Sequence, residues 1–138
     1  MEQPPKLLTV EEANRLLEQA MPLVQQLQRL HVSILQTNQQ LDDDVQKLSV
    51  GNGYPIQELR ERIEKLTAAQ MKLLEEFQAA LQQLETLGCV LKDVSTGLID
   101  FYSLRDGEVV CLCWRVGEER IGFWHRLEDG FAGRQPLL

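Results

Sequence analysis

Reactive and ligand-binding side chains concentrate near the end of the chain, in the stretch CLCWRVGEERIGFWHRLEDGFAGR at residues 111–134. Its cysteines and histidine are ligand types that Zn²⁺ takes in proteins, and together with Asp100 they could also be a nucleophile, a base and an orienting acid. Its arginines are suited to binding carboxylates or phosphates. The residues of this stretch could therefore support three functions, namely metal binding, catalysis and anion binding.

Each chemistry depends on which side chains share one face of a sheet. After Gly88 the sequence has the period of two that is typical of strands, over CVLKDVS, LIDFYSL, EVVCLCWRV and RIGFWHRL. RDGE at 105–108 predicts a two-residue hairpin turn, because Asp-Gly tolerates the backbone angles of such a turn, and VGEE at 116–119 is a weaker second candidate. We therefore expect a three- or four-stranded antiparallel meander over residues 89–127.

Two-residue loops at Asp106-Gly107 and Gly117-Glu118 would fix the pairing of these strands. One face would then hold Cys113 between Asp100 and Gly122, Cys111 between Tyr102 and Trp124, and Arg115 between Leu98 and Arg120. The other face would carry Val110, Leu112 and Trp114 together with His125, and would pack on helices. This pairing predicts a site on the Cys113 face, where Gly122 leaves room.

The expected strand pairing argues against both a metal site and a catalytic site. It separates His125 from Asp100 and Cys113, and a Cys-x-Cys pair on a flat strand holds its Cβ atoms roughly 6.6 Å apart, farther than the ~4.6 Å that can separate two thiolates on one zinc ion. We therefore predict no metal and no cofactor, and expect the thiols to be small buried hydrophobes. His125 would bond a helix side chain or a backbone carbonyl, and Asp100 would pair with Arg115 or Arg134.

Anion binding rests on GFAGR at residues 130–134. Its glycines could free backbone amides, and Arg134 could bind a carboxylate or phosphate through two hydrogen bonds. In the alternative interpretation, Phe131 fills a pocket and Arg134 pairs with an acidic side chain. Both possibilities remain open at this point.

Two long helices precede the predicted sheet. Thr9 and Glu12 form a capping box, and apolar heptads follow over residues 9–49 and 55–87, joined by a turn at SVGNGYP and ended by Gly88. Pro22 should kink or split the first helix. The sequence thus predicts an α+β fold in one domain, residues 1–138, with a coiled-coil-like antiparallel helical hairpin, the meander, and an irregular tail over 128–138.

Composition excludes several classes of protein. The net charge of −7 disfavours nucleic-acid binding, and no run of about 18 apolar residues could cross a membrane. The first residues lack the pattern of a signal peptide. Three cysteines, an odd number, favour a reducing compartment, so we expect a cytoplasmic protein.

The whole chain resembles a bacterial family known only as domain of unknown function 2203. TVEEANRLLEQAMPLV resembles the opening helix of that family, and the closing stretch follows its pattern CW..GE..I..WH....GF.GR.P. The resemblance supports a small hairpin-plus-sheet protein and implies no activity. It brings several polar residues forward which, with Arg115, are our candidate ligand-binding residues: Asp100, Cys113, Arg115, Glu118, Trp124, His125 and Arg134.

Two functions follow from these observations. The sequence favours a non-enzymatic interaction or assembly protein that forms homo-oligomers, because a pair of long heptad helices cannot cover its own seam. The alternative is a protein, or an enzyme, that binds a small anionic ligand on the polar face of the sheet. Whether the chain is an enzyme stays undecided, although a non-enzymatic role is favoured.

Overall fold

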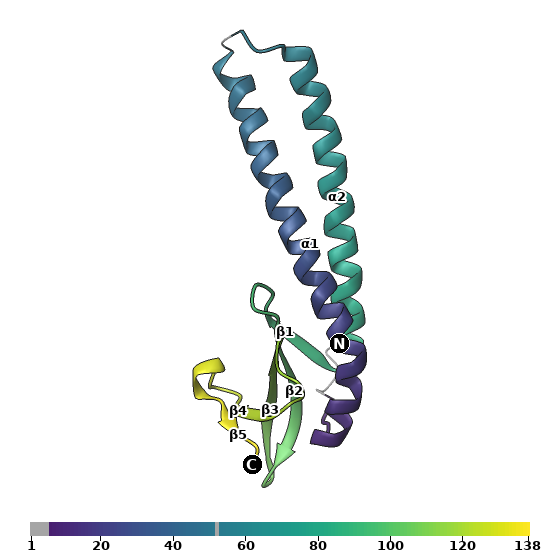
Figure 1. Ribbon diagram of the computed structural model, residues 1–138, viewed down its shortest axis with the longest axis vertical. Helices are drawn as coiled ribbons and strands as arrows, with labels where there is room; N and C mark the ends of the chain where they lie inside the picture. Colours follow the sequence, from purple (N-terminus) through teal and green to yellow (C-terminus); the bar gives the residue numbers. More distant parts are fainter. Residues whose placement is uncertain (1–5, 52) are drawn as a thin grey trace. The chain divides into compact units, whose positions relative to one another are not determined.

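The computed structural model describes residues 6–51 and 53–138, and has two helices followed by a five-stranded sheet (Figure 1). These residues divide into two compact units. The hairpin unit is Arg29–Ala79, and the sheet unit is built from the two flanking segments, residues 6–28 and 80–138. The predicted α+β class, with a helical hairpin followed by an antiparallel sheet, is confirmed.

Helix α1 spans Val10–Val50 and helix α2 spans Ile56–Thr86, each within one residue of the predicted bounds. Pro22 lies inside α1 without splitting it, and its position is exposed, so water can reach the backbone carbonyl that the proline leaves without a donor. Over the described residues, neither helix has an apolar stretch long enough to cross a membrane.

The start of α1 is held by the predicted capping box. Thr9 N–H donates to Glu12 Oε1 over 2.9 Å, and Glu12 N–H donates to Thr9 Oγ1 over 3.1 Å. The hydrogen bond from the Thr9 backbone is the main reason that the pKa of Glu12 lies below its ordinary value. This exchange satisfies backbone donors that have no partner inside the helix.

Within the hairpin unit, the two helices meet along the predicted heptad rows, which contain buried polar residues as well as leucines. Asp44 is buried and forms an ion pair with Arg62, in which Asp44 Oδ1 lies 3.2 Å from Arg62 Nη2. Gln70 is also buried, and its amide donates to the backbone oxygen of Ile34 over 3.2 Å and to Asn38 Oδ1. These polar contacts fix the register of α1 against α2, because a shift by one turn would leave buried polar atoms unpaired.

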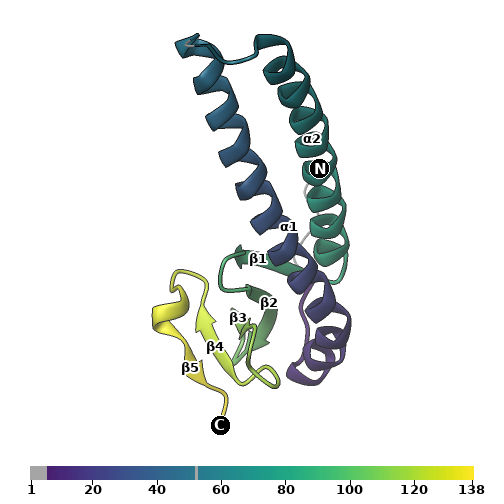
Figure 2. The ribbon, with the colours of Figure 1, turned by 45° about the horizontal axis from the view of Figure 1, so that its top comes forward.

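The sheet unit contains a meander in which each strand pairs antiparallel with the next along the chain (Figure 2). The strands are β1 Cys89–Asp93, β2 Leu98–Arg105, β3 Glu108–Arg115, β4 Phe123–Arg126 and β5 Gln135–Pro136. A 3₁₀ turn, Phe131–Gly133, precedes β5. The sequence predicted an irregular tail here, and β5 is only two residues long, too short to show a period of two.

The core of the sheet unit lies between one face of the sheet and the first turns of α1. The buried apolar residues of that face are Ile99, Phe101, Val110, Leu112 and Trp114, and those of α1 are Ala13, Leu17, Ala20, Val24 and Leu27. Two side chains of α1 also bond the sheet segment, since Asn14 Oδ1 accepts from Ile121 N–H and Gln28 Nε2 donates to the Ser95 carbonyl. The apolar face that helical spacing predicts on α1 thus packs against the apolar face that strand alternation predicts on the sheet, and together they form one core.

Candidate functional site

The β2–β3 hairpin has the predicted register. Asp106 and Gly107 both have positive φ angles, 52° and 78°, as a two-residue turn of this kind requires. Arg105 therefore faces Glu108, and the alternation carries back to place Asp100 directly opposite Cys113. The Asp-Gly turn alone accounts for this pairing of an acid with a thiol.

The β3–β4 connection is longer than the predicted two-residue loop and occupies residues 116–122. Glu118 holds it in place, because the Glu118 backbone oxygen accepts from the indole Nε1 of Trp114 over 3.0 Å and its carboxylate accepts from the Arg115 N–H over 2.8 Å. These two bonds stabilise a folded loop in place of a tight turn.

The longer loop shifts β4 by one residue relative to the predicted register. His125 lies opposite Cys111, and Phe123 lies opposite Cys113. The predicted neighbours, Trp124 for Cys111 and Gly122 for Cys113, were therefore wrong. A slip of one residue moves every side chain to the opposite face, so His125 joins the polar face and Trp124 leaves it.

The shift brings Asp100, Cys113 and His125 together, and we call these three residues the Asp–Cys–His centre. One ligand atom from each lies within 4.8 Å of the other two, and His125 Nε2 is 3.0 Å from Asp100 Oδ2. The residues are 1%, 0% and 4% exposed, respectively. The expectation that Asp100 pairs with Arg115 or Arg134 is wrong, since its partner is His125, which reaches across β3.

The hydrogen bonds of His125 limit where its protons can be. Nδ1 lies 2.8 Å from the backbone oxygen of Arg126, an atom that can only accept, so Nδ1 carries a hydrogen. The contact from Nε2 to Asp100 Oδ2 then needs one further proton, on either atom. Nε2 of His125 therefore faces Asp100, and Nδ1 faces the Arg126 carbonyl.

The arrangement resembles the cysteine, histidine and acid of a nucleophilic triad, but Cys113 is poorly suited to attack a substrate. Burial, followed by the nearby charge of Asp100, raises the pKa of Cys113 to about 12 and that of Cys111 to about 11. A reactive cysteine needs a lowered pKa and access to solvent. Cys113 has neither, so the geometry does not support nucleophilic catalysis.

Arg134, the second element of the polar face, is clamped by Glu118. Its Nη1 and Nη2 donate to the two carboxylate oxygens, each over 2.9 Å, and Nη2 also donates to the Cys113 carbonyl over 3.2 Å. Burial alone would raise the pKa of Glu118, but the hydrogen bonds from Arg134 and the Arg115 backbone lower it below its ordinary value. Of the two interpretations of Arg134, pairing with an acidic side chain is the observed one.

Aromatic rings enclose the same guanidinium. The centre of the Phe123 ring lies 3.9 Å from the Arg134 carbon that joins its nitrogens, and the Phe131 ring centre lies 4.6 Å from it. Arg115 also lies over Phe131, at 5.1 Å. We call Glu118, Arg134 and the two phenylalanines the arginine clasp. It joins the C-terminal segment to β3 and β4 through a charged bidentate pair and cation–π contacts.

The remaining candidate residues lie outside these two groups. Trp124 pairs with Leu112 on the opposite face, and its ring is stacked by Arg105, whose central guanidinium carbon is 4.6 Å from the ring centre. Arg115 is exposed. The seven candidates therefore separate into the Asp–Cys–His centre, the arginine clasp with Arg115 beside it, and Trp124 on its own.

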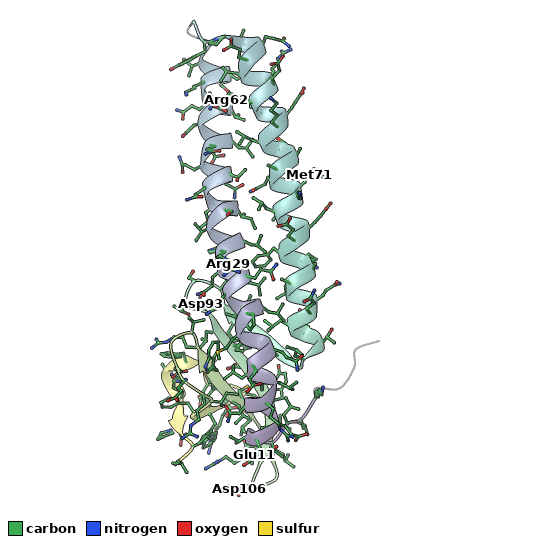
Figure 3. The ribbon with its side chains drawn as sticks, turned by 45° about the vertical axis from the view of Figure 1, so that its right-hand side comes forward. Glu11, Arg29, Arg62, Met71, Asp93 and Asp106 are labelled. Carbon is green, nitrogen blue, oxygen red and sulfur yellow. The ribbon has the colours of Figure 1, made fainter. Side chains whose placement is uncertain are left out.

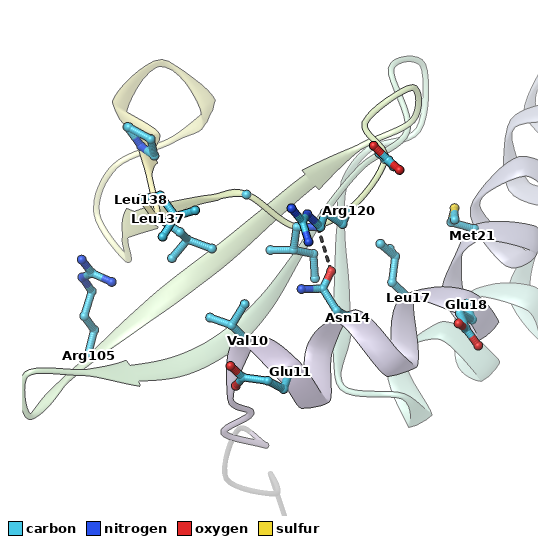
Figure 4. A pocket seen from close by; sticks show the side chains of 14 residues that line it. Val10, Glu11, Asn14, Leu17, Glu18, Met21, Arg105, Arg120, Leu137 and Leu138 are labelled. Carbon is cyan, nitrogen blue, oxygen red and sulfur yellow. Dashed lines mark hydrogen bonds between the residues drawn. The ribbon is translucent and has the colours of Figure 1, made fainter.

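The sheet unit also has an open cleft of about 920 Å³ that the sequence did not indicate (Figure 4). It lies between the first turns of α1, the β3–β4 loop and the last residues of the chain, with Asn14 bonded to Ile121 at its floor. Arg105 and Arg120 line it together with Glu11, Glu18 and Glu119. Its walls come from segments far apart in the sequence, so no local motif could reveal it, and its mixed charges favour no ligand class.

Comparison with known proteins gives one result. The profile of a family described as uncharacterized conserved protein (DUF2203) matches residues 6–137. No curated protein and no solved structure matches the chain. The match covers almost all of the sequence and carries no activity, substrate or partner with it.

Proposed function

This chain belongs to the DUF2203 family of uncharacterized conserved proteins, and we propose that it is a non-enzymatic assembly protein that self-associates through its hairpin unit. The observation that carries the proposal is a set of exposed apolar side chains on one side of the hairpin. We call this set the apolar flank. Its members are each 48% to 60% exposed, and they are Leu35, Val45, Met71 and Leu74.

Residues from both helices meet in the apolar flank. The Asp44–Arg62 ion pair fixes the register, and nine residues further along the hairpin, away from the turn, Leu35 of α1 comes level with Met71 of α2. Arg62 and Met71 are labelled on α2 in Figure 3. Helical periodicity places Leu74 beside Met71 and turns the flank away from the seam between the helices. The flank is thus one surface, shared by α1 and α2.

The other side of the hairpin has a different character. A shallow groove there is lined mainly by polar side chains, with Ser33, Gln36 and Gln40 from α1 facing Lys72 and Glu76 from α2. The polar groove and the apolar flank therefore lie on different sides of the hairpin. Exposed apolar surface rimmed by polar residues is typical of an interaction site.

A second copy of the chain is the occupant that fits this surface. Two hairpins packed flank to flank about a two-fold axis form a four-helix bundle, in which each apolar flank covers the other. Such a bundle would extend the heptad seam of each hairpin into a coiled-coil-like core. The three cysteines, Cys89, Cys111 and Cys113, are buried and form no disulfide with one another. An odd number of cysteines suits a reducing compartment, so a cytoplasmic location is part of the proposal.

The alternative function, binding of an anionic ligand by Arg134, has less support. Glu118 already holds both terminal nitrogens of Arg134, so a ligand would have to displace a bidentate partner. No other observation selects an anionic ligand for the polar face.

The test is the molar mass of the full chain in solution, measured by size-exclusion chromatography with light scattering. We expect a dimer or larger oligomer at micromolar concentration, and we expect Leu35→Lys combined with Met71→Lys to give monomers, because charges on the flank cannot be buried without a partner. A matched control, Gln36→Lys with Gln40→Lys, adds the same charge to the polar side and should leave the mass unchanged. A monomeric wild-type chain would refute the proposal.

A further inference from the structure

We propose that the Asp–Cys–His centre binds a divalent transition metal ion of the zinc class. The ligands are Nε2 of His125, Sγ of Cys113 and a carboxylate oxygen of Asp100. This site is separate from the surface that carries self-association, so either proposal can fail without the other.

The first argument is geometric. The three ligand atoms lie within 4.8 Å of one another and come from neighbouring strands of a single sheet. Zinc takes sulfur at ~2.3 Å and nitrogen or oxygen at ~2.0–2.2 Å, so ligand atoms around one ion lie within about 4.5 Å of each other. The present separations are therefore close to those that one ion requires. A nitrogen, a sulfur and an oxygen ligand together favour zinc over the harder Mg²⁺ or Ca²⁺.

The second argument is the orientation of the histidine. Nδ1 of His125 donates to the Arg126 carbonyl over 2.8 Å, which directs Nε2 into the centre. A histidine that binds a metal through one ring nitrogen almost always donates the other N–H to a carbonyl, a carboxylate or water. The outer partner that a ligating histidine requires is therefore already in place.

The third argument is an unsatisfied atom. Asp100 Oδ1 is buried and has no hydrogen-bond partner among the residues that the structure describes. A buried carboxylate oxygen without a partner is costly and needs an explanation. A divalent ion bound by one thiolate and one carboxylate would leave the buried group without net charge. Because His125 Nε2 would leave Oδ2 to bind the ion, a carboxylate that holds the ion through both oxygens would satisfy Oδ1 and Oδ2 together.

Cys111 is the nearest candidate for a fourth ligand. It lies two residues before Cys113 on the same face of β3 and directly opposite His125. It is not one of the three residues whose ligand atoms lie within 4.8 Å of one another, so water is the alternative fourth ligand. The two cases differ in the number of thiolates on the metal.

The experiment is a Co²⁺ titration of the full chain, refolded from denaturant without metal so that the buried centre is accessible. Cobalt bound by thiolate in a tetrahedral site gives a charge-transfer band and intense visible absorption. We expect one equivalent of Co²⁺ to saturate these bands and one equivalent of Zn²⁺ to abolish them. Cys113→Ser should weaken binding at least about a hundredfold. It should remove the charge-transfer band if Cys113 is the single thiolate ligand, and reduce the band if Cys111 is the fourth ligand. A Cys111→Ser variant that loses part of the band would identify the fourth ligand.

Cys89→Ser is the matched control. Cys89 is an equally buried cysteine of the same sheet, but it pairs with Phe101 and lies on the opposite face. Its substitution should leave the cobalt spectrum unchanged. A folded wild-type chain that gives no cobalt bands would overturn the proposal whatever the variants do, and so would bands of undiminished intensity and affinity in Cys113→Ser.

Discussion

Glu118 joins three parts of the sheet unit through one residue. Its carboxylate binds Arg134 near the end of the chain and the Arg115 N–H at the end of β3, and its backbone oxygen binds the Trp114 indole. Glu118 therefore holds the loop after β3 in place through both its side chain and its backbone. The register of β4, and with it the position of His125, depends on this loop.

We predict that Glu118→Gln destabilises the protein by about 1.5–3 kcal/mol at neutral pH, because it removes charge-assisted hydrogen bonds to Arg134. Thermal unfolding of the wild type and the variant would measure this difference. Glu119→Gln, at the exposed neighbouring position, is the control and should change the melting temperature little.

The Glu118–Arg134 pair makes the stability of the folded chain depend on pH, in a direction that follows from the pKa of Glu118. The pKa of Glu118 is lowered in the folded chain, so its stabilisation is complete above the ordinary glutamate pKa, near 4.5, and is lost as the pH falls through the lowered value. The stability difference between the wild type and Glu118→Gln should therefore be constant near neutrality and shrink below about pH 4. A difference that stays constant down to pH 3 would show that packing, and not charge, accounts for it.

At the scale of residues, the sequence predicted that two of the three residues of the Asp–Cys–His centre are neighbours. Asp100 and Cys113 could be paired because the Asp106-Gly107 turn fixes the β2–β3 register without help from the rest of the chain. His125 could not be placed, because its position depends on a loop held by contacts to Arg134, far along the sequence. The seven candidate residues do not form one group in space, because His125 joins Asp100 and Cys113 while Trp124 lies on the opposite face.

Among the elements, the hairpin seam has polar residues where a heptad pattern calls for apolar ones. Asp44 is buried, and its Oδ2 has no hydrogen-bond partner within the described part of the chain, while its ion-pair partner Arg62 is largely exposed. Asp44 therefore costs stability and contributes to the register of the helices, as single polar residues do in coiled coils.

We expect Asp44→Leu to raise the stability of the hairpin by about 1–3 kcal/mol, because it replaces a poorly satisfied buried carboxylate with an apolar side chain of similar reach. Chemical denaturation followed by circular dichroism would measure the gain. Asp43→Leu, an exposed position on the same turn, serves as the control. A loss of stability in Asp44→Leu would mean that the Arg62 pair outweighs the cost of burial.

The helices were the most predictable elements, because the capping box, the heptads and the glycine turn are all local signals. The four longer strands followed from alternation and turn residues. β5 did not, since two residues paired at the sheet edge leave no pattern, and the Leu137 N–H bond to the Gly122 carbonyl beside them joins distant segments.

At the scale of the whole molecule, the division into two units predicts that the hairpin can be shortened without a change in the sheet unit. The deletion of residues 42–48 together with 58–64 removes one heptad from each helix and both members of the Asp44–Arg62 pair. We expect this paired deletion to keep the seam in register and to leave the fluorescence of the buried Trp114 in the sheet unit unchanged.

Deletion of residues 42–48 alone is the contrasting variant. It shifts α1 against α2 by two turns and separates Gln70 from Ile34 and Asn38, so it should unfold the hairpin at a lower temperature than the paired deletion does. Equal melting temperatures for the two variants would contradict the register that the buried polar residues are thought to fix.

The sheet unit is assembled from the two ends of the chain, and the hairpin unit is the segment between them. Its folding therefore requires the closure of a long loop, and the entropy of closure grows with the number of flexible residues between the joined points. Helices that form early would shorten that loop, because their turn brings residue 28 back towards residue 80 before any strand pairs. Early formation of the hairpin would then affect the rate at which the sheet unit folds, as well as the stability of the final structure.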